Sequence, residues 1–400
     1  MSLVSVQEKK FVPGLFTFSI VCYRNWEYLT QTIDSVLMQD YNPIQLIVSD
    51  DGSGNFPIDD FVEYIEKNKR DNVVSYVVRS SEKNEGTVRH LNHVLDCVEG
   101  EFFMIMAGDD TLDNPYVFSR YVNVFRREGS DCGVVMAQTA MYDITMTEVL
   151  DYFVWPDVID AINNPKDPDE LKRQLYYMPC IPTTSTCFRR WVIDQFTPFD
   201  TNYFLIEDYP FHIKLAEANV KMCYENCITA RHRDGGISHG AVTALSRTKQ
   251  RYYEDCIRAR RKAMDSAKKN HAARDLVSFN RFQIFSTERM IYTTGTGLKG
   301  LLRYAMHYPK EFIIERSQSA NIYAMYKWLS FGLAFLFALL FVPEVCVTLL
   351  SSGVFESVTF LQLAAEAMLK VLMVLSFVRA AVELVKLCIC KLGAFPDYLT

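Results

Sequence analysis

Residues 16–22 read FTFSIVC and residues 44–48 read IQLIV, two short apolar runs rich in β-branched and aromatic side chains. Runs of this length and composition are typical of buried β-strands. Five apolar residues between them recur on one face of a helix: Tyr28, Leu29, Ile33, Val36 and Leu37. Because this spacing is that of an amphipathic helix, the segment predicts a strand, a helix and a second strand.

The same alternation continues further along the chain. Residues 73–78 (VVSYVV) and 102–106 (FFMIM) are strand-like runs, and residues 87–98 between them are compatible with a helix. Strands that alternate with helices indicate a mostly parallel sheet with helices on both faces. The predicted fold class is therefore α/β. Ligands of such sheets bind at the carboxyl ends of the strands.

The composition is that of an ordinary folded protein. The 400 residues exceed what one hydrophobic core usually organises, so we expect at least one further structural unit. A formal net charge of −6 argues against a nucleic-acid-binding protein, which normally carries a strongly basic surface. The 11 cysteines show no pairing of spacings typical of structural zinc, so we expect no zinc site.

Two pairs of adjacent aspartates follow predicted strands. Asp50-Asp51 come after the run at 44–48, and Asp109-Asp110 come after the run at 102–106. Because the carboxyl ends of parallel strands meet at one edge of a sheet, we expect both pairs to face one crevice. Adjacent carboxylates repel each other, and a bound divalent cation would relieve that repulsion. The alternative is a polar turn that ends each strand and caps the next helix.

A third acidic pair, Glu207-Asp208, lies in FLIEDYPFHIKLAEAN, directly before a stretch with a helical apolar face. An Asp at the start of a helix often provides only a favourable charge at the helix N-terminus. The functional alternative is a general base that removes the proton from an alcohol nucleophile. The sequence pattern alone leaves both interpretations open.

Taken together, these motifs resemble the family 2 glycosyltransferases, and the resemblance covers roughly residues 15–240. It is carried by five ordered segments: SIVCYRNWEYLTQTIDSVLMQDY (19–41), IQLIVSDDGSG (44–54), NEGTVRHLN (84–92), GDDTLDNP (108–115) and FDTNYFLIEDYPFHIKLA (199–216). The resemblance implies a GT-A-like fold with a nucleotide-binding sheet. It also implies transfer of a sugar from a nucleotide-diphospho-sugar to an acceptor hydroxyl, with inversion of configuration.

The resemblance also implies roles for the residues on the donor side. Asp51 is expected to contact the nucleobase, with Asp50 supporting the turn and Tyr23 near the base. Asp109 is expected to lie against the ribose. Asp110 is expected to bind the Mn²⁺ or Mg²⁺ ion that bridges the diphosphate and takes up charge as it departs.

On the acceptor side, the resemblance makes Asp208 the catalytic base, with Glu207 positioning the acceptor or the base. Arg89 either approaches the phosphates or is an ordinary surface arginine. No Gln-x-x-Arg-Trp sequence follows Glu207-Asp208, and that sequence is the signature of the processive polysaccharide synthases of this family. We therefore expect transfer of a single sugar.

The sequence RHRDGGIS at residues 231–238 resembles the family segment that closes over the diphosphate. Its candidates for that contact are His232, Arg233 and Ser238, and the alignment leaves open whether His232 or Arg233 takes the role. One departure from the family is Ala107, which stands where many relatives have the first Asp of an Asp-x-Asp-Asp run.

Two other functions compete with sugar transfer. The first is a non-catalytic nucleotide-sugar-binding or membrane assembly protein of the same fold, against which the presence of Asp51, Asp110 and Asp208 argues. The second is a nucleotidyltransferase. Such enzymes usually carry a glycine-rich basic loop after the first strand, whereas the loop here reads CYRNWEY without a glycine.

The chain is expected to have three parts, namely a catalytic domain at 1–240, a helical extension at 241–326 and a membrane-associated hairpin with its tail at 327–400. The extension carries a group of basic residues: Arg258, Arg260, Arg261, Lys262, Lys268 and Lys269. These residues form either a solvated helix face or a surface attracted to anionic lipid.

The predicted hairpin consists of residues 328–350 and 357–378, each long enough to cross a bilayer core. Basic residues flank the pair but are absent from the connecting loop, which places both ends on the cytosolic side. The first ten residues lack the apolar core of a signal peptide. We therefore expect a membrane-associated protein with a cytoplasmic catalytic domain and a glycan or lipid-linked acceptor. Whether the hairpin spans the membrane or lies on it stays open.

Overall fold

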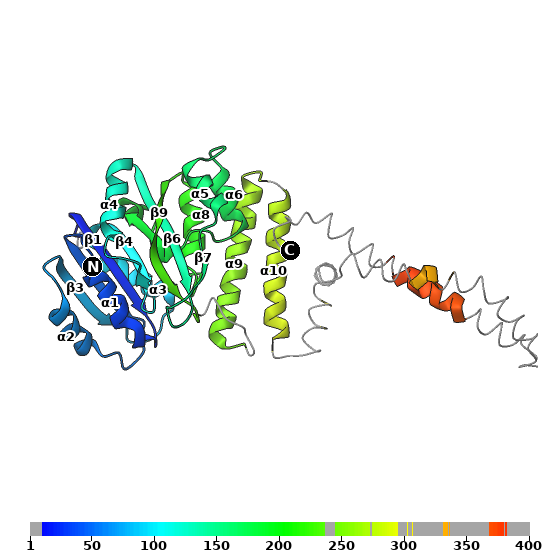
Figure 1. Cartoon of the computed structure of the whole chain (residues 1–400), viewed down its shortest axis with the longest axis horizontal. Coiled ribbons are helices and arrows are strands. Elements are labelled where there is room, and N and C mark those ends of the chain that lie inside the picture. The colour runs from blue at the N-terminus through cyan, green and yellow to red at the C-terminus, as the bar shows by residue number, and fades with distance from the viewer. Residues whose placement is uncertain are drawn as a thin grey trace, which may run out of the picture. The chain divides into compact units, whose positions relative to one another are not determined.

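The structure is a computed structural model that describes residues 10–236, 245–272 and 274–294 of the first part of the chain. The chain divides into two compact units, Met1–Gly295 and Thr296–Thr400. The first unit contains the sheet and the helices that flank it (Figure 1). The second unit is described at residues 302, 306, 331–334, 336, 368–379 and 381. Of the candidate site residues, only Ser238 lies outside the described residues.

The first unit is built around a nine-stranded sheet with the strand order β3-β2-β1-β4-β8-β6-β9-β5, in which β7 pairs with β6. The strands are β1 (Val12–Cys22), β2 (Ile44–Asp50), β3 (Val73–Ser80), β4 (Gly100–Ala107), β5 (Thr111–Leu112), β6 (Cys132–Tyr142), β7 (Val149–Tyr152), β8 (Thr186–Arg189) and β9 (Lys221–Arg233). Strand β1 is parallel to β2 and β4, and β2 is parallel to β3.

The prediction of a mostly parallel sheet is wrong for the second half of the sheet. Strand β8 is antiparallel to both β4 and β6, β5 is antiparallel to β9, and β7 is antiparallel to β6, while β6 and β9 are parallel. The connection from β7 to β8 contains two helices, Pro156–Asn163 and Glu170–Tyr177, and ends in a short 3₁₀ turn at Thr183–Ser185. A parallel pair requires a long crossover connection, but such a connection does not exclude an antiparallel pair. The sheet is therefore mixed.

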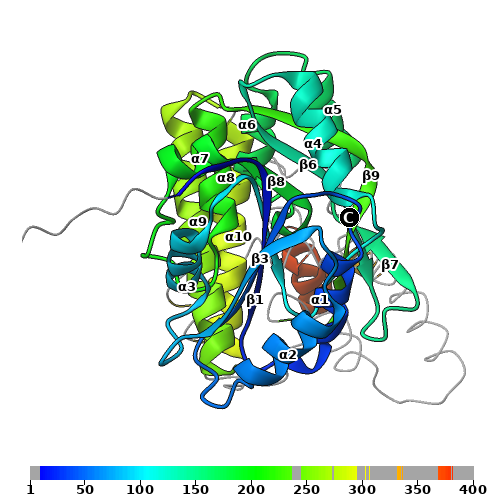
Figure 2. The ribbon, with the colours of Figure 1, turned by 90° about the vertical axis from the view of Figure 1, so that its left-hand side faces the viewer.

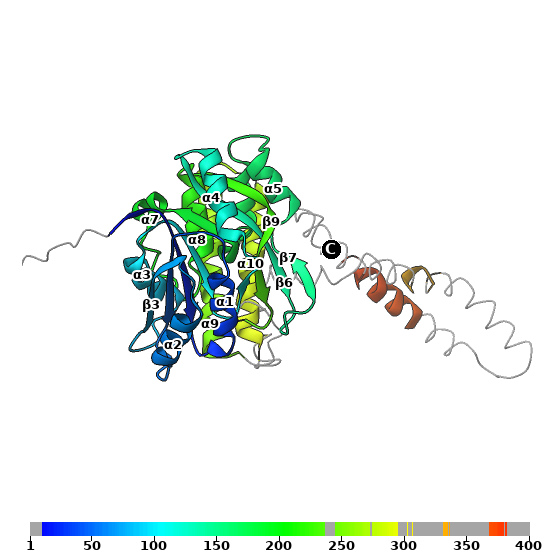
Figure 3. The same ribbon diagram turned by 60° about the vertical axis from the view of Figure 1, so that its left-hand side comes forward.

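Helices cover both faces of the sheet (Figures 2 and 3). They are α1 (Leu29–Leu37), α2 (Ile58–Asn68), α3 (Thr87–Val94), α4 (Val117–Glu128), α5 (Pro156–Asn163), α6 (Glu170–Tyr177), α7 (Arg190–Phe196), α8 (Asp208–Glu217), α9 (Arg247–Lys269) and α10 (Arg274–Thr293). Apolar side chains of α1, α2 and α4 pack on one face, and those of α3, α8 and α9 pack on the other. Helices α9 and α10 run side by side within the same compact unit.

The strand residues alternate between the two apolar layers. Leu46 and Val48 of β2 face the layer under α1 and α2, whereas Ile47 faces the opposite layer. The rings of Phe16 and Phe118 stack with their centroids 4.0 Å apart. Burying a large apolar side chain of this kind contributes roughly 1.5–3 kcal/mol. The sheet is thus fixed from both sides, and so are the ends of its strands.

In the second unit, Gly332 lies against the ring of Phe377, which a Cβ on residue 332 would approach to 3.0 Å. Several large apolar side chains of this unit are exposed: Phe331, Leu333, Leu336, Met368, Val371, Val374, Leu375 and Val378. Among the residues that the structure describes, no helix has the length and apolar composition needed to cross a membrane. The predicted runs at 328–350 and 357–378 lie largely outside the described residues.

Candidate active site

The carboxyl ends of β1, β2 and β4 meet at one edge of the sheet, where Cys22 of β1 pairs with Asp50 of β2. Burial raises the pKa of the Cys22 thiol, and the charges of Asp50, Asp109 and Asp51 raise it further. The N–H of Asp51 donates to the carbonyl of Cys22 at 2.9 Å, and the N–H of Gly108 donates to the carbonyl of Val21 at 2.9 Å. The two aspartate pairs, which are far apart in the sequence, therefore lie together around the end of β1.

Asp50 organises the turn that follows β2. Its carboxylate is buried and accepts hydrogen bonds from the backbone N–H of Ser53 at 2.8 Å and from the Ser53 hydroxyl. The hydroxyl of Ser80, at the end of β3, donates to the same carboxylate at 2.6 Å. Asp50 thus joins two strand ends and supports the turn after β2.

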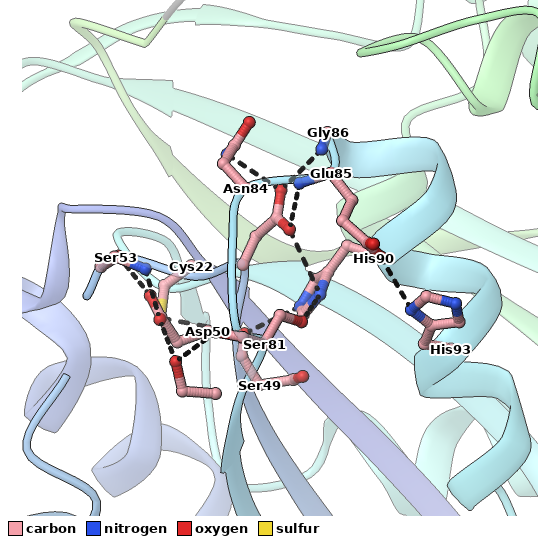
Figure 4. Close-up of polar contacts among 12 residues, drawn as sticks. Cys22, Ser49, Asp50, Ser53, Ser81, Asn84, Glu85, Gly86, His90 and His93 are labelled. Atoms are coloured by element: carbon pink, nitrogen blue, oxygen red, sulfur yellow. Dashed lines mark hydrogen bonds and ion pairs between the residues drawn. The ribbon is translucent and has the colours of Figure 1, made fainter. Parts of the chain in front are cut away.

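Asp51 holds the turn at Asn84–Gly86 (Figure 4). Its Oδ2 accepts the side-chain amide of Asn84 at 3.0 Å and the N–H of Gly86 at 2.9 Å, and its Oδ1 accepts the N–H of Glu85 at 3.0 Å. Burial raises the pKa of Asp51 even though these hydrogen bonds oppose the shift. A carboxylate has about four lone-pair positions, and three of those of Asp51 are engaged by this turn.

Two glycines allow these turns to approach each other and the segment before α8. Gly52 has φ 72°, and a Cβ there would lie 2.2 Å from the backbone of Lys83. Gly86 has φ 86°, and a Cβ there would lie 2.7 Å from the ring of Phe204. Only glycine adopts such a φ readily and permits such contacts. The Asp51 turn, the Asn84–Gly86 turn and Phe204 therefore form one packed group.

Asp110 has a fully buried side chain. Its Oδ2 lies 2.9 Å from Nδ1 of His232, and its Oδ1 accepts the backbone N–H of Arg233 at 3.0 Å. The adjacent Asp109 is partly buried, and burial together with the charge of Asp110 raises its pKa. Asp110 thus joins the end of β4 to His232 and Arg233 of β9, and Asp109 lies beside it.

His232 and Arg233 have different surroundings. Burial alone would lower the pKa of His232, but the hydrogen bond to Asp110 and the neighbouring carboxylate charges raise it above the usual value. The buried guanidinium of Arg233 engages four groups: the carbonyl oxygens of Asp109 and Ile144, the side chain of Gln31 and the ring of Tyr28. His232 therefore adjoins the acidic site, whereas Arg233 ties β9 to α1 and to the end of β4.

A divalent cation, which the family resemblance implies, is compatible with the chemistry of this region. Asp109, Asp110 and His232 offer carboxylate oxygens and an imidazole nitrogen, which are ligand types that divalent cations accept. Both oxygens of Asp110 are already hydrogen-bonded, however, so it would bind a cation only by sharing or exchanging those bonds. The described residues contain no group of three or more His, Cys, Asp or Glu side chains arranged to hold a metal ion.

Two further predicted donor-side residues are exposed. The Tyr23 ring, at the end of β1, is 38% exposed with the Arg24 guanidinium 5.1 Å from its centroid, and such a ring can stack on a base. Arg89 is exposed on the first turn of α3, and no hydrogen bond or ion pair of its side chain is found among the described residues. Its neighbour His90 is buried with Nδ1 3.7 Å from Asp51 Oδ1.

Glu207 and Asp208 stand at the start of α8, where both are partly buried. Burial raises the pKa of Asp208. Burial and the charge of Asp208 raise the pKa of Glu207 to about 8. The segment before the pair contacts α3, because the carbonyl of Phe204 accepts the N–H of Val88 at 3.3 Å. The acidic pair is thus linked to the turn that Asp51 holds.

Sequence reasoning missed His90. His90 follows Gly86 by four residues, which places it on the helix face that turns back toward Asp51. That spacing was a usable signal. Sequence reasoning also missed Asp255 of α9, which contacts the segment before Glu207 and lies in no motif.

Residues 17–199 match the family model described as glycosyl transferase family 2. This segment belongs to that family. The family 2 glycosyl transferase segment contains the strand-end aspartates and the Asn84–Gly86 turn, but it ends before Glu207-Asp208 and before His232.

Two curated relatives and one solved structure are similar to the chain. An uncharacterized glycosyltransferase of Haemophilus influenzae is 25% identical over 207 residues, which are 48% of this chain and 57% of that protein. A processive diacylglycerol beta-glycosyltransferase of Mycoplasma genitalium is 25% identical over 122 residues, which are 30% of this chain and 35% of that protein. Both matches span less than two thirds of the relative. The crystal structure of S. aureus TarS 1-349 in complex with UDP-GlcNAc is 16% identical, with a TM-score of 0.48, over 74% of this chain and 78% of that chain.

Proposed function

We propose that this protein is an inverting glycosyltransferase that moves one sugar from a nucleotide-diphospho-sugar to an acceptor hydroxyl. The observation that carries the proposal is the partly buried pair Glu207-Asp208, linked through Phe204 to the turn that Asp51 holds. A donor held at the strand ends would thereby have a carboxylate base beside it.

On the acceptor side, Asp208 would accept the hydroxyl proton as the oxygen attacks the anomeric carbon. A base with a raised pKa binds that proton more strongly than an ordinary aspartate does. Glu207, with a pKa of about 8, retains its proton at neutral pH and can donate a hydrogen bond to the acceptor. Attack from the side opposite the leaving group inverts the anomeric configuration in a single displacement.

On the donor side, Asp51 and Tyr23 would hold the nucleobase and Asp109 the ribose. Asp110 would hold a Mn²⁺ or Mg²⁺ ion, which supplies positive charge to the departing diphosphate. Asp110 keeps His232 in place through its 2.9 Å contact with Nδ1. Arg89, on the exposed first turn of α3, is long enough to approach a phosphate there.

The acceptor and the location belong to the same proposal. The exposed apolar side chains at 331–336 and 368–379 favour association of the second unit with a lipid surface. A protein attached in this way, with its catalytic domain in the cytoplasm, would act on a glycan or lipid-linked acceptor in surface polysaccharide biosynthesis.

The proposed activity can be tested by incubating the full chain with Mn²⁺ and each common nucleotide sugar in turn. Release of the nucleoside diphosphate and an upward shift of the melting temperature should single out one donor. Proton NMR of the first product should show the anomeric configuration opposite to that of the donor. Retention of configuration would reject the displacement. Binding of a donor without any turnover would favour the non-catalytic binding protein.

The pH dependence of kcat should follow the acidic pair. Because burial raises the pKa of Asp208, the acid limb should lie at a higher pH than an ordinary aspartate gives, and kcat should rise through it. Glu207→Gln should remove any second change in kcat near pH 8, because Glu207 is the group that titrates near pH 8. The acid limb of the profile should stay in place. Initial rates at saturating substrates between about pH 4 and 9 would measure both limbs. A flat profile in this range would contradict the assignment of the base.

A further inference from the structure

The segment that leads to the acidic pair is held from outside the family segment. Between α7 and α8 the chain forms no helix or strand, and the N-cap residue of α8, Glu207, makes no side-chain capping hydrogen bond. Backbone N–H groups in such a loop need another acceptor when they are withdrawn from water. Helix α9 provides one.

Asp255 of α9 is 2% exposed, and its Oδ2 accepts the backbone N–H groups of both Phe204 and Leu205, each at 2.7 Å. Its other oxygen lies 3.2 Å from the guanidinium of Arg258, which also donates to the carbonyl of Asn202. Hydrogen bonds to an ionised acceptor are roughly twice as strong as neutral ones. The loop is therefore fixed at two consecutive residues just before Glu207.

The opposite side of the same loop faces the donor region. Phe204 accepts the N–H of Val88 through its carbonyl, and its ring fills the space above Gly86. The Arg251 guanidinium of α9 lies 4.3 Å from the centroid of that ring. Residue 204 is thus clamped between α9 and the turn that Asp51 holds, and the position of Glu207-Asp208 follows from this clamp.

The helix that carries the acidic pair also packs on α9. Helix α8, which begins at Asp208, contacts α9 within the first unit. Helix α9 therefore touches both the loop before the acidic pair and the helix that follows it.

We infer that Asp255 is a positioning residue that sets the location of the catalytic base relative to the donor, an inference that rests on the proposed function. Asp255 touches neither reacting atom and acts through the backbone of Phe204 and Leu205. Displacing a reacting group by about 1 Å can lower a rate about 100-fold without weakening the binding of a substrate held elsewhere.

The experiment compares Asp255→Ala and Asp255→Asn with Asp265→Ala in the full chain. Asp265 lies on the same helix with a side chain that is 71% exposed and paired with Lys268, so it is a matched control. We expect Asp255→Ala to lower kcat about 100-fold while the donor KM stays within about threefold. Asp255→Asn keeps an oxygen that accepts both N–H groups, so it should restore most of kcat. Asp265→Ala should match the wild type.

A second measurement reports the anchor without using activity. Hydrogen exchange at the amides of Phe204 and Leu205 should be faster in Asp255→Ala by about tenfold or more and unchanged in Asp265→Ala. Unchanged exchange at both amides, or a kcat equal to that of the wild type in Asp255→Ala, would overturn the inference and leave the proposed function intact. A wild-type chain that turns over no donor would overturn the proposed function, and this inference with it.

Discussion

Replacing Asp208 by Asn should lower kcat about 1,000-fold, because an amide cannot accept the proton that the acceptor hydroxyl loses. The change preserves the size of the side chain and its contact with the N–H of Tyr209 at 2.6 Å, so the fold should persist. Donor KM should change little, since the base acts on the acceptor. Steady-state rates with the donor identified by the nucleotide-sugar screen would measure the effect.

The matched control is Asp131→Asn, which makes the same chemical change at a side chain that is 72% exposed near the amino end of β6. Its kcat should equal that of the wild type within about twofold, because surface substitutions away from a site have small effects. If Asp208→Asn retained more than about a tenth of the wild-type kcat, general-base catalysis by this residue would be excluded.

Replacing Asp51 by Asn should destabilise the protein and weaken donor binding together. Three N–H donors converge on the Asp51 carboxylate, and an asparagine would turn an N–H₂ group toward at least one of them. Leaving a buried donor without an acceptor costs about 1–3 kcal/mol, so we expect a loss of about 2–4 kcal/mol in the free energy of unfolding. Denaturant titration would measure this loss.

Donor binding should weaken at least about tenfold in the same variant, because the Asn84–Gly86 turn would no longer be fixed. The control is Asp60→Asn in the first turn of α2, where the exposed carboxylate only favours the helix N-terminus. That contribution is about 0.3–1 kcal/mol. If Asp51→Asn were as stable as Asp60→Asn, the clamp described for Asp51 would not support the turn.

The parallel half of the sheet could be predicted because each strand there is a short apolar run and each crossover carries a helical pattern. The order of these strands brings Asp50-Asp51 and Asp109-Asp110 to one edge. There, the charges of Asp50, Asp51 and Asp109 all raise the pKa of the buried Cys22 thiol. The antiparallel insertion of β8 could not be predicted. Its pairing depends on β4 and β6, which are distant in the sequence, and its four residues carry no periodicity of their own.

The site was predictable where a residue's role depends on its own segment and unpredictable where it depends on remote partners. Asp50 and Asp51 act on turns that the motif itself forms or adjoins. Arg233, in contrast, is buried by groups from α1 and from the loop before β7, and nothing in RHRDGGIS shows that. The same holds for Asp255, whose two bonds reach back about 50 residues to a loop without regular structure.

The family segment ends at residue 199, yet the acidic pair, the histidine beside Asp110 and the carboxylate that anchors residue 204 all follow it. Recombination that exchanged only the family segment between two such proteins would separate the strand-end carboxylates from the proposed base. A segment that contains both the strand-end carboxylates and the helix that anchors the acidic pair therefore reaches at least to the end of α9, at Lys269.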